Sequence, residues 1–263
     1  MLPKRAPKVK ENYWTESSRP LYALLFLLPL ITLYEVGIAY FNSATSQLQV
    51  RNAADVLLRQ AASGLGMMAL FEKAGLDQGF IWFMLSGLIV VLTLVVWQFA
   101  VKSSWTVKPG YIGLMWFESC FFGLLMVGVL MGIHVLSRPE LSNPDNIRSM
   151  PTGAGLTLSV GAGIFEEYLF RLAGMGLVFL FLRRVVEVSA AAAYITSAVL
   201  TAVVFAAFHL AGPFGESFDA ARFLLRTCSG LFFASLFAVR GFGVTAGAHA
   251  AYDAIVVLIG GAA

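Results

Sequence analysis

Residues 79–101 read GFIWFMLSGLIVVLTLVVWQFAV, a run in which no side chain carries a charge. An α-helix rises about 1.5 Å per residue, so this run is long enough to cross the roughly 30 Å hydrocarbon core of a bilayer. A helix of this length on the surface of a soluble protein would carry polar residues along one face. The stretch therefore predicts a transmembrane helix, and it sets the fold class of the chain.

The composition of the whole chain agrees with a membrane environment. Of the 263 residues, 59% are hydrophobic and 13% are charged, compared with about half and about a quarter in soluble domains. The formal net charge of +3 is small, and the basic residues gather in loops beside apolar helices, where they fit phospholipid headgroups. We therefore expect membrane lipid as a partner and exclude nucleic acid.

Further apolar windows of about 20 residues accompany the first run. The seven predicted spans are 21–41, 79–101, 111–136, 154–182, 189–210, 220–239 and 244–262. The segment 52–74 mixes apolar and charged residues, which is typical of a helix that lies in the membrane interface or dips partly into it. The predicted fold class is all-α, a polytopic transmembrane bundle of about seven to eight helices.

Ionisable residues inside the predicted spans concentrate in the second half of the chain. A charge in the middle of a span costs about 2.5 to 3.5 kcal/mol on insertion scales, so its retention indicates a partner, a wet cavity or a function. Three sets occur: Glu166, Glu167 and Arg171 in GIFEEYLFRL, Phe205 and His209 in VVFAAFHL, and His249 and Asp253 in AHAAYDAI. Earlier in the chain, Glu118 is interpreted as a helix-face or interfacial group, and Arg226 is a candidate partner for Glu35.

Helical spacing separates the roles of the two adjacent glutamates. On a helix that turns about 100° per residue, Arg171 lies about 40° from Glu167 but about 140° from Glu166. We therefore predict an ion pair between Glu167 and Arg171, with Glu166 facing a different helix. A carboxylate without its own ion pair, in a wall of low dielectric, is suited to act as a general base toward water.

The two histidines follow the same four-residue spacing as their neighbours. Phe205 can pack beneath the imidazole of His209 and fix its direction, and His249 stands one turn before Asp253. A neutral histidine can donate a hydrogen bond to a developing oxyanion. Water activated on one side and an oxyanion held on the other together amount to peptide hydrolysis.

Straight spans would place His209 and His249 toward opposite faces of the membrane. Their convergence requires tilted helices or a helix that begins inside a cavity. The glycines of the segment RGFGVTAGAH, at 240–249, permit such a start, because irregular backbone at membrane depth is tolerated where it lines a wet pocket. We therefore predict a wet pocket at these motifs.

The ordered motifs resemble those of the CAAX prenyl protease and bacteriocin-processing family, also called the CPBP or Abi family, of intramembrane proteases. The family pattern is E-E-x-x-x-R, then F-x-x-x-H, then H-x-x-x-N or D. All three motifs occur here in that order, within roughly residues 150–262. The resemblance implies a glutamate-dependent intramembrane endopeptidase. The preceding 150 residues match the family in being membrane helices.

The resemblance also implies roles for the site residues. Glu166 would activate the hydrolytic water together with His209, and His249 with Asp253 would form the oxyanion site. Glu167, Arg171 and Phe205 would support them. Many family members carry asparagine where this chain has Asp253, and an ionised aspartate donates no hydrogen bond. Asp253 would then be protonated, orient His249 or serve as a metal ligand.

Two alternatives stay open beside this interpretation. Glu166, His209 and His249 are also suitable ligands for a divalent metal such as zinc, although the chain lacks the H-E-x-x-H spacing of zinc proteases, and we expect no cofactor. A transporter or proton relay is the other alternative. It would string charges along a path across the membrane, whereas these charges are expected to converge.

The predicted domain organisation and partners follow from these observations. We expect a basic cytoplasmic amino-terminal segment at 1–20, amino-terminal transmembrane helices at 21–150 with an interfacial helix at 52–74, and a catalytic transmembrane core at 151–263. The expected substrate is a membrane-associated peptide or protein, with a carboxyl-terminal or lipidated segment as the class that the family name indicates. The expected location is the bacterial plasma membrane, as an integral multi-pass protein.

Overall fold

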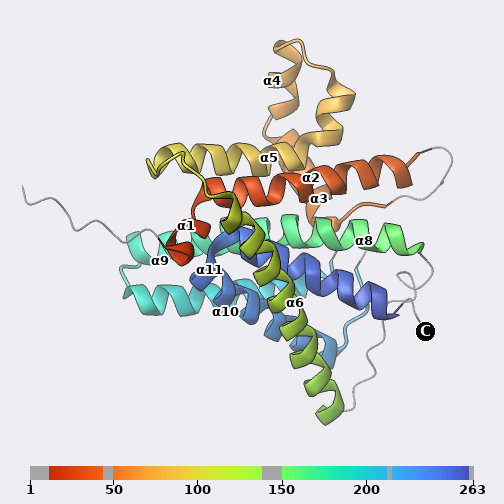
Figure 1. The fold of residues 1–263 in the computed structure, drawn as a ribbon, viewed down its shortest axis with the longest axis vertical. Coiled ribbons are helices and arrows are strands. Elements are labelled where there is room, and N and C mark those ends of the chain that lie inside the picture. Colours follow the sequence, from red (N-terminus) through yellow and green to blue (C-terminus); the bar gives the residue numbers. More distant parts are fainter. Residues whose placement is uncertain (1–11, 44–49, 138–149, 212–214, 261–263) are drawn as a thin grey trace, which may run out of the picture.

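The computed structural model describes residues 12–43, 50–137, 150–211 and 215–260, and every regular element in these residues is helical. The elements are shown in Figure 1. They are α1 (Tyr13–Ser17), α2 (Pro20–Phe41), α3 (Ala53–Gly64), α4 (Met67–Lys73), α5 (Gln78–Ala100), α6 (Pro109–Ser137), α8 (Thr152–Gly161), η1 (Ala162–Glu166), η2 (Tyr168–Met175), α9 (Gly176–Arg184), α10 (Ala190–Phe208) and α11 (Ala220–Gly260). The predicted all-α class is confirmed.

Five helices in the described part of the chain are long and apolar enough to cross a membrane. They are α2, α5, α6, α10 and α11, and their bounds agree closely with the predicted spans up to residue 210. Residues 1–11 of the predicted basic segment and residues 261–262 of the last predicted span lie outside the described residues. The agreement is expected, because the length of an apolar run is a property of the sequence alone.

The predicted span 154–182 is helical throughout but not uniformly α-helical. Between α8 and α9 the chain forms two π-helical stretches, η1 and η2, in which the backbone turns are widened. Such turns are rare and occur frequently at functional sites. Glu166 ends η1, and Arg171 lies within η2.

The two predicted spans 220–239 and 244–262 are the two legs of α11, which bends at Gly241. This glycine has φ +74° and ψ −176°, outside the helical region. An L side chain would be strained at that φ, and a Cβ atom would also lie 3.2 Å from the Cα atom of Ser18. The break lets the second leg, which carries His249, leave in a direction different from the first leg.

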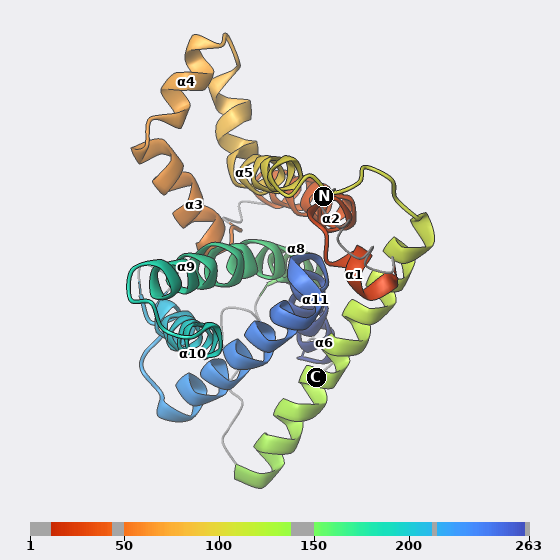
Figure 2. The same cartoon turned by 90° about the vertical axis from the view of Figure 1, so that its left-hand side faces the viewer.

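Helices α3 and α4 form an arm that begins in the core and extends away from it (Figures 1 and 2). Asn52, Asp55 and Arg59, at and near the start of α3, are buried, whereas α4 has no buried residue. The segment 52–74 therefore consists of two short helices, with its first turns inserted among the longer helices.

The second leg of α11 and the helices around it form the centre of the bundle. Helix α11 packs on α6, α8 and α10, and α2 packs on α5 and α8. Figure 2 shows α6 crossing the bundle obliquely beside α11. Aromatic side chains fill the core between α2, η1 and α11, including Phe26, Tyr34, Phe165 and Phe242. This packing brings the helices that carry the three motifs together.

Side chains cap the amino-terminal ends of α3 and α5. The Asn52 side chain accepts hydrogen bonds from backbone N–H groups in the first turn of α3, and Asp77 does the same for α5. Such caps satisfy amide groups that have no partner within the helix, and asparagine, aspartate and serine serve about equally well.

The charged groups in the amino-terminal spans are paired, but differently from the sequence-based expectation. Oε1 of Glu35 lies 3.7 Å from Nη2 of Arg59 in α3, so the suggested pairing of Glu35 with Arg226 was wrong. Nη2 of Arg226 instead lies 2.8 Å from Oε1 of Glu216. Glu118, interpreted from the sequence as a helix-face or interfacial group, forms an ion pair with Arg240. Both pairings join distant segments, which no local spacing reveals.

Candidate active site

Glu166 and Glu167 stand side by side at the junction of the two π-helical stretches, and both are buried. Their side chains nevertheless have different partners. Glu167 is fully buried, and its Oε2 lies 3.2 Å from Arg171 Nε. The ion pair predicted from helical spacing is therefore present, because the widened turn still brings positions four apart to the same face.

Arg171 is buried with its charge compensated on several sides. Besides Glu167, its guanidinium donates to the carbonyl oxygen of Gly230 at 3.1 Å. The guanidinium carbon lies 4.6 Å from the centre of the Phe205 ring and 5.9 Å from that of Phe233. These contacts favour a charged arginine in an apolar setting, and they lock the carboxylate of Glu167 in place.

His249 connects the second leg of α11 to the glutamates. Its Nδ1 lies 2.7 Å from Oε1 of Glu167. Its Nε2 faces two further carboxylates, Oδ2 of Asp253 at 3.4 Å and Oε2 of Glu166 at 4.0 Å. The ring is stacked on Phe233, with 4.6 Å between centroids and 12° between planes. The imidazole is thus held by a carboxylate on one edge and presents the other edge to the remaining acidic groups.

His209 caps the carboxyl end of α10 and reaches the same region through Phe205. Its Nδ1 lies 2.9 Å from the carbonyl oxygen of Phe205. Because a carbonyl only accepts hydrogen bonds, the neutral ring carries its hydrogen on Nδ1, which leaves Nε2 as the basic nitrogen. The Phe205 ring contacts both imidazoles, with centroids 5.0 Å from His209 and 6.1 Å from His249. Both imidazoles therefore lie beside the Phe205 ring, although straight spans would place them toward opposite faces of the membrane.

A close approach of two backbones brings Glu166 and His249 together. Gly163 faces the second leg of α11, where a Cβ atom added to it would lie 2.5 Å from the carbonyl oxygen of Ala246 and 2.6 Å from Ala250. Any larger residue would force η1 and α11 apart. The absence of a side chain at position 163 is thus a condition for the short distances around His249.

Two contributors to the cluster were not foreseen from the sequence. Asn52, at the start of α3, donates from Nδ2 to Oε1 of Glu166 at 3.0 Å. Phe233 supplies the stacking surface for His249. Neither residue belongs to a motif: Asn52 lies 114 residues from Glu166, and Phe233 is one of 22 phenylalanines. A capping asparagine between charged residues gave no local signal of a catalytic contact.

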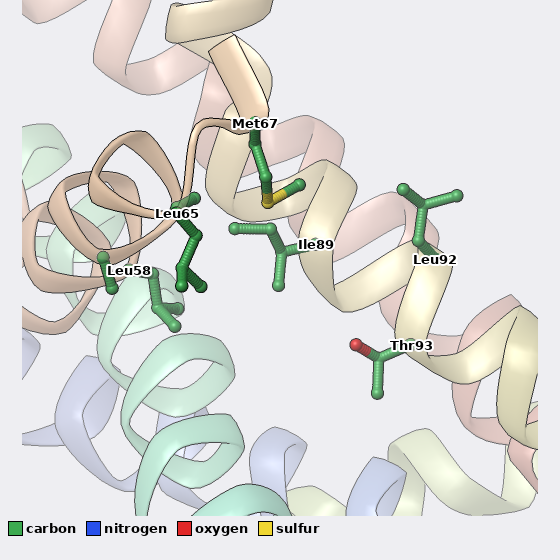
Figure 3. Close-up of a pocket in the computed structure, with 8 residues that line it drawn as sticks. Leu58, Leu65, Met67, Ile89, Leu92 and Thr93 are labelled. Atoms are coloured by element: carbon green, nitrogen blue, oxygen red, sulfur yellow. The ribbon is translucent and has the colours of Figure 1, made fainter. Parts of the chain in front are cut away.

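A cavity of about 270 Å³ lies between α3, α4 and α5 (Figure 3). It is lined by Leu58, Ala61, Ala62, Leu65, Met67, Ile89, Leu92 and Thr93. Thr93 is hydrogen-bonded to Tyr168, the residue after Glu167, at 2.9 Å. The lining of this cavity is apolar and includes none of the motif residues, so the wet pocket expected at the motifs themselves stays a prediction.

The arrangement of the candidate ligand side chains bears on the alternative metal site. Among the described residues, no group of three or more histidine, cysteine, aspartate or glutamate side chains is arranged to hold a metal ion. Glu166, His209 and His249, the alternative ligand set, are therefore close but not arranged as a ligand shell. The metal-free expectation itself stays a prediction.

Comparison with known proteins agrees with the motif resemblance. Residues 148–255 match the family model described as type II CAAX prenyl endopeptidase, Rce1-like. The matched segment contains all three motifs, from Glu166 to Asp253, so the recognition of a CAAX-protease-like family is confirmed there. No curated protein and no solved structure matches the chain. Together with the five membrane-length helices in the described residues, this match supports an integral, multi-pass membrane protein.

Proposed function

We propose, from the family match and the geometry of the cluster, that this protein is an intramembrane glutamic endopeptidase that hydrolyses a peptide bond of a membrane-associated substrate. The observation that carries the proposal is that the two glutamates contact His249 on different edges of its ring. Its Nδ1 is held by Glu167, while its Nε2 edge faces Glu166 and Asp253. One glutamate is therefore occupied in structure, and the other remains available for chemistry.

Glu166 is the general base in this proposal. Unlike Glu167, it forms no ion pair with an arginine among the described contacts, and it sits at the end of a π-helical turn. Its carboxylate takes a proton from a water molecule, and the water oxygen attacks the carbonyl carbon of the substrate. His209 assists from its basic Nε2, because its Nδ1 hydrogen is engaged by Phe205.

His249 stabilises the oxyanion that this attack creates. The doubly protonated ring donates from both nitrogens: Nδ1–H donates to the carboxylate of Glu167, which fixes the orientation of the ring, and Nε2–H is the donor to the oxyanion. The Asp253 side chain, 28% exposed, lies on the Nε2 edge and accepts hydrogen bonds when ionised. We assign it the role of orienting His249, which was one of the three options that the sequence left open.

The second half of the reaction returns the proton. The tetrahedral intermediate collapses, the carbon–nitrogen bond breaks, and the amine leaves with the proton that Glu166 took from water. The products are a carboxylic acid and an amine, and transfer of the acid's proton to the amine gives a carboxylate and an ammonium group, so atoms and charges balance. Glu166 thus accepts a proton once and donates it once.

The proposed substrate is a peptide segment close to the membrane. The cluster is buried among apolar helices, and a cavity with an apolar lining lies between α3, α4 and α5. Such surroundings favour a substrate that enters from lipid, for example a carboxyl-terminal or lipidated segment. The bacterial plasma membrane stays the expected location.

The test is a comparison of membrane peptides by mass spectrometry. Membranes that contain the wild-type protein are compared with membranes that contain the Glu166→Gln variant at equal abundance. Peptides cleaved in the wild-type sample and intact in the variant identify the substrate and support Glu166 as the base. Identical peptide patterns in which both proteins cleave would overturn the glutamate mechanism.

A further inference from the structure

We propose that Asn52 is a positioning residue for the base, supplied by a part of the chain that lies outside the family match. The inference rests on the function proposed for Glu166. Asn52 Nδ2 donates to Oε1 of Glu166 at 3.0 Å, and both side chains are buried. Within the described residues, this is the hydrogen bond that the Glu166 side chain accepts.

The direction of the Asn52 amide is fixed by its other contacts. Its Oδ1 accepts hydrogen bonds from the backbone N–H of Ala54 at 2.8 Å and of Asp55 at 3.4 Å, as the cap of α3. Those donors require oxygen on that side of the amide. The NH₂ group must therefore face Glu166, and it cannot rotate away without loss of the cap.

The start of α3 is itself anchored to the neighbouring helices. The backbone N–H of Asn52 donates to the Tyr34 hydroxyl at 3.3 Å, and that hydroxyl donates to Asp55 at 2.6 Å. Asp55 also pairs with the buried Arg59 at 2.5 Å. This network is buried, so it holds Asn52 rigidly against η1 rather than at a mobile edge.

The consequence is that the two carboxylate oxygens of Glu166 have different partners. Oε1 receives the Asn52 amide, and Oε2 is the oxygen that faces His249 at 4.0 Å. Asn52 thereby selects the side-chain rotamer in which Oε2 is directed at the proposed reaction centre. Positioning of this kind matters for rate, because small displacements of a catalytic group are costly.

Substitutions at Asn52 separate positioning from capping. Asparagine, aspartate and serine cap helices about equally well, so Asn52→Asp and Asn52→Ser preserve α3 while they remove the donor to Glu166. We expect kcat to fall roughly tenfold in Asn52→Ser and roughly a hundredfold in Asn52→Asp, with KM unchanged, since a hydrogen bond to a charged group is lost and, in the second variant, a like charge is added.

Asp77 provides the matched control, because it caps α5 by accepting from the backbone N–H of Phe80 and is exposed. Asp77→Asn and Asp77→Ser exchange the same residue types at a cap remote from any catalytic candidate, and they leave kcat unchanged. If the Asn52 variants match the Asp77 variants in kcat, Asn52 is a cap and nothing more, and the proposal is overturned.

A second measurement does not depend on proteolysis. Combining Asn52→Asp with Glu166→Gln exchanges donor and acceptor across the contact, so the double variant regains the melting temperature that Asn52→Asp alone loses. Additive melting temperatures would contradict the contact. Should Glu166→Gln cleave substrate normally, the proposed function fails while this exchange still tests the contact, so the two failures are distinguishable.

Discussion

The Nδ1 atom of His249 lies 2.7 Å from Oε1 of Glu167, across 82 residues of sequence. The second glutamate of the E-E motif therefore contacts two charged or polar partners, Arg171 on its own helix and His249 of α11. The first glutamate forms no ion pair with Arg171 among the described contacts, and its Oε2 lies 4.0 Å from Nε2 of His249. This asymmetry between neighbouring residues leads to different predictions for the same substitution at each position.

Glu167→Gln is expected to destabilise the protein, whereas Glu166→Gln is expected to abolish cleavage in a folded protein. Loss of the Glu167 charge leaves Arg171 buried without its partner, which costs about 3 to 5 kcal/mol. Glutamine at position 166 still accepts the Asn52 amide, while a general base that contributes about 10²- to 10⁴-fold is lost. Thermal unfolding in detergent and peptide cleavage are measured on both variants. Equal loss of stability in the two would contradict the asymmetry.

Gly163→Ala is expected to lower both stability and activity, because the added methyl group meets the backbone of α11. Overpacking of this kind costs about 1 to 3 kcal/mol, and the displacement separates Glu166 from His249. The control is Gly176→Ala in α9, where an added Cβ atom has nothing within 4 Å. We expect that variant to be neutral or slightly more stable, by roughly 0.5 to 1 kcal/mol, since alanine favours helices. Unfolding and cleavage assays on both variants check the contrast.

Chelation tests the metal-free mechanism directly. We expect the cleavage rate of the purified protein to be unchanged after incubation with a divalent-metal chelator and dialysis. Loss of activity that zinc restores would favour the alternative in which Glu166, His209 and His249 are ligands. Metal content measured on the same samples links the two readouts.

Acid is expected to weaken the contact between Glu216 and the carboxyl end of α10. The backbone N–H of Glu216 donates to the His209 carbonyl oxygen at 2.9 Å. Burial raises the pKa of Glu216, but hydrogen bonds from Arg226 and Arg222 outweigh it, and the pKa is lowered on balance. A pKa that is lower in the folded than in the unfolded protein adds stability above the unfolded value, and this stability is lost as the pH falls through the folded value.

The corresponding measurement is the melting temperature as a function of pH for the wild type and Glu216→Gln. The two curves should differ near neutral pH and converge in acid, below the folded pKa of Glu216. A difference that stays constant across the whole pH range would show that the charge of the Glu216 carboxylate does not stabilise the contact between Glu216 and His209. The side chain is partly exposed, so added salt should reduce the difference.

The sequence by itself determined the features that depend on short separations along the chain. Uncharged runs such as 79–101 are long enough to span lipid, and this follows from composition. Positions four apart share a helix face, so the ion pair of Glu167 with Arg171 was predictable even though the turn proved to be π-helical. The order of the motifs indicated the family whose model matches residues 148–255.

Tertiary structure alone decided which distant groups meet. The contacts of Asn52 with Glu166, of Glu35 with Arg59 and of Phe233 with His249 depend on how the helices pack. The bend at Gly241 sets the direction of the leg that carries His249. Hydrophobic burial is not directional and leaves many packings of apolar helices close in energy. The choice among them is made by close backbone approaches and buried polar contacts, which join residues that no local pattern relates.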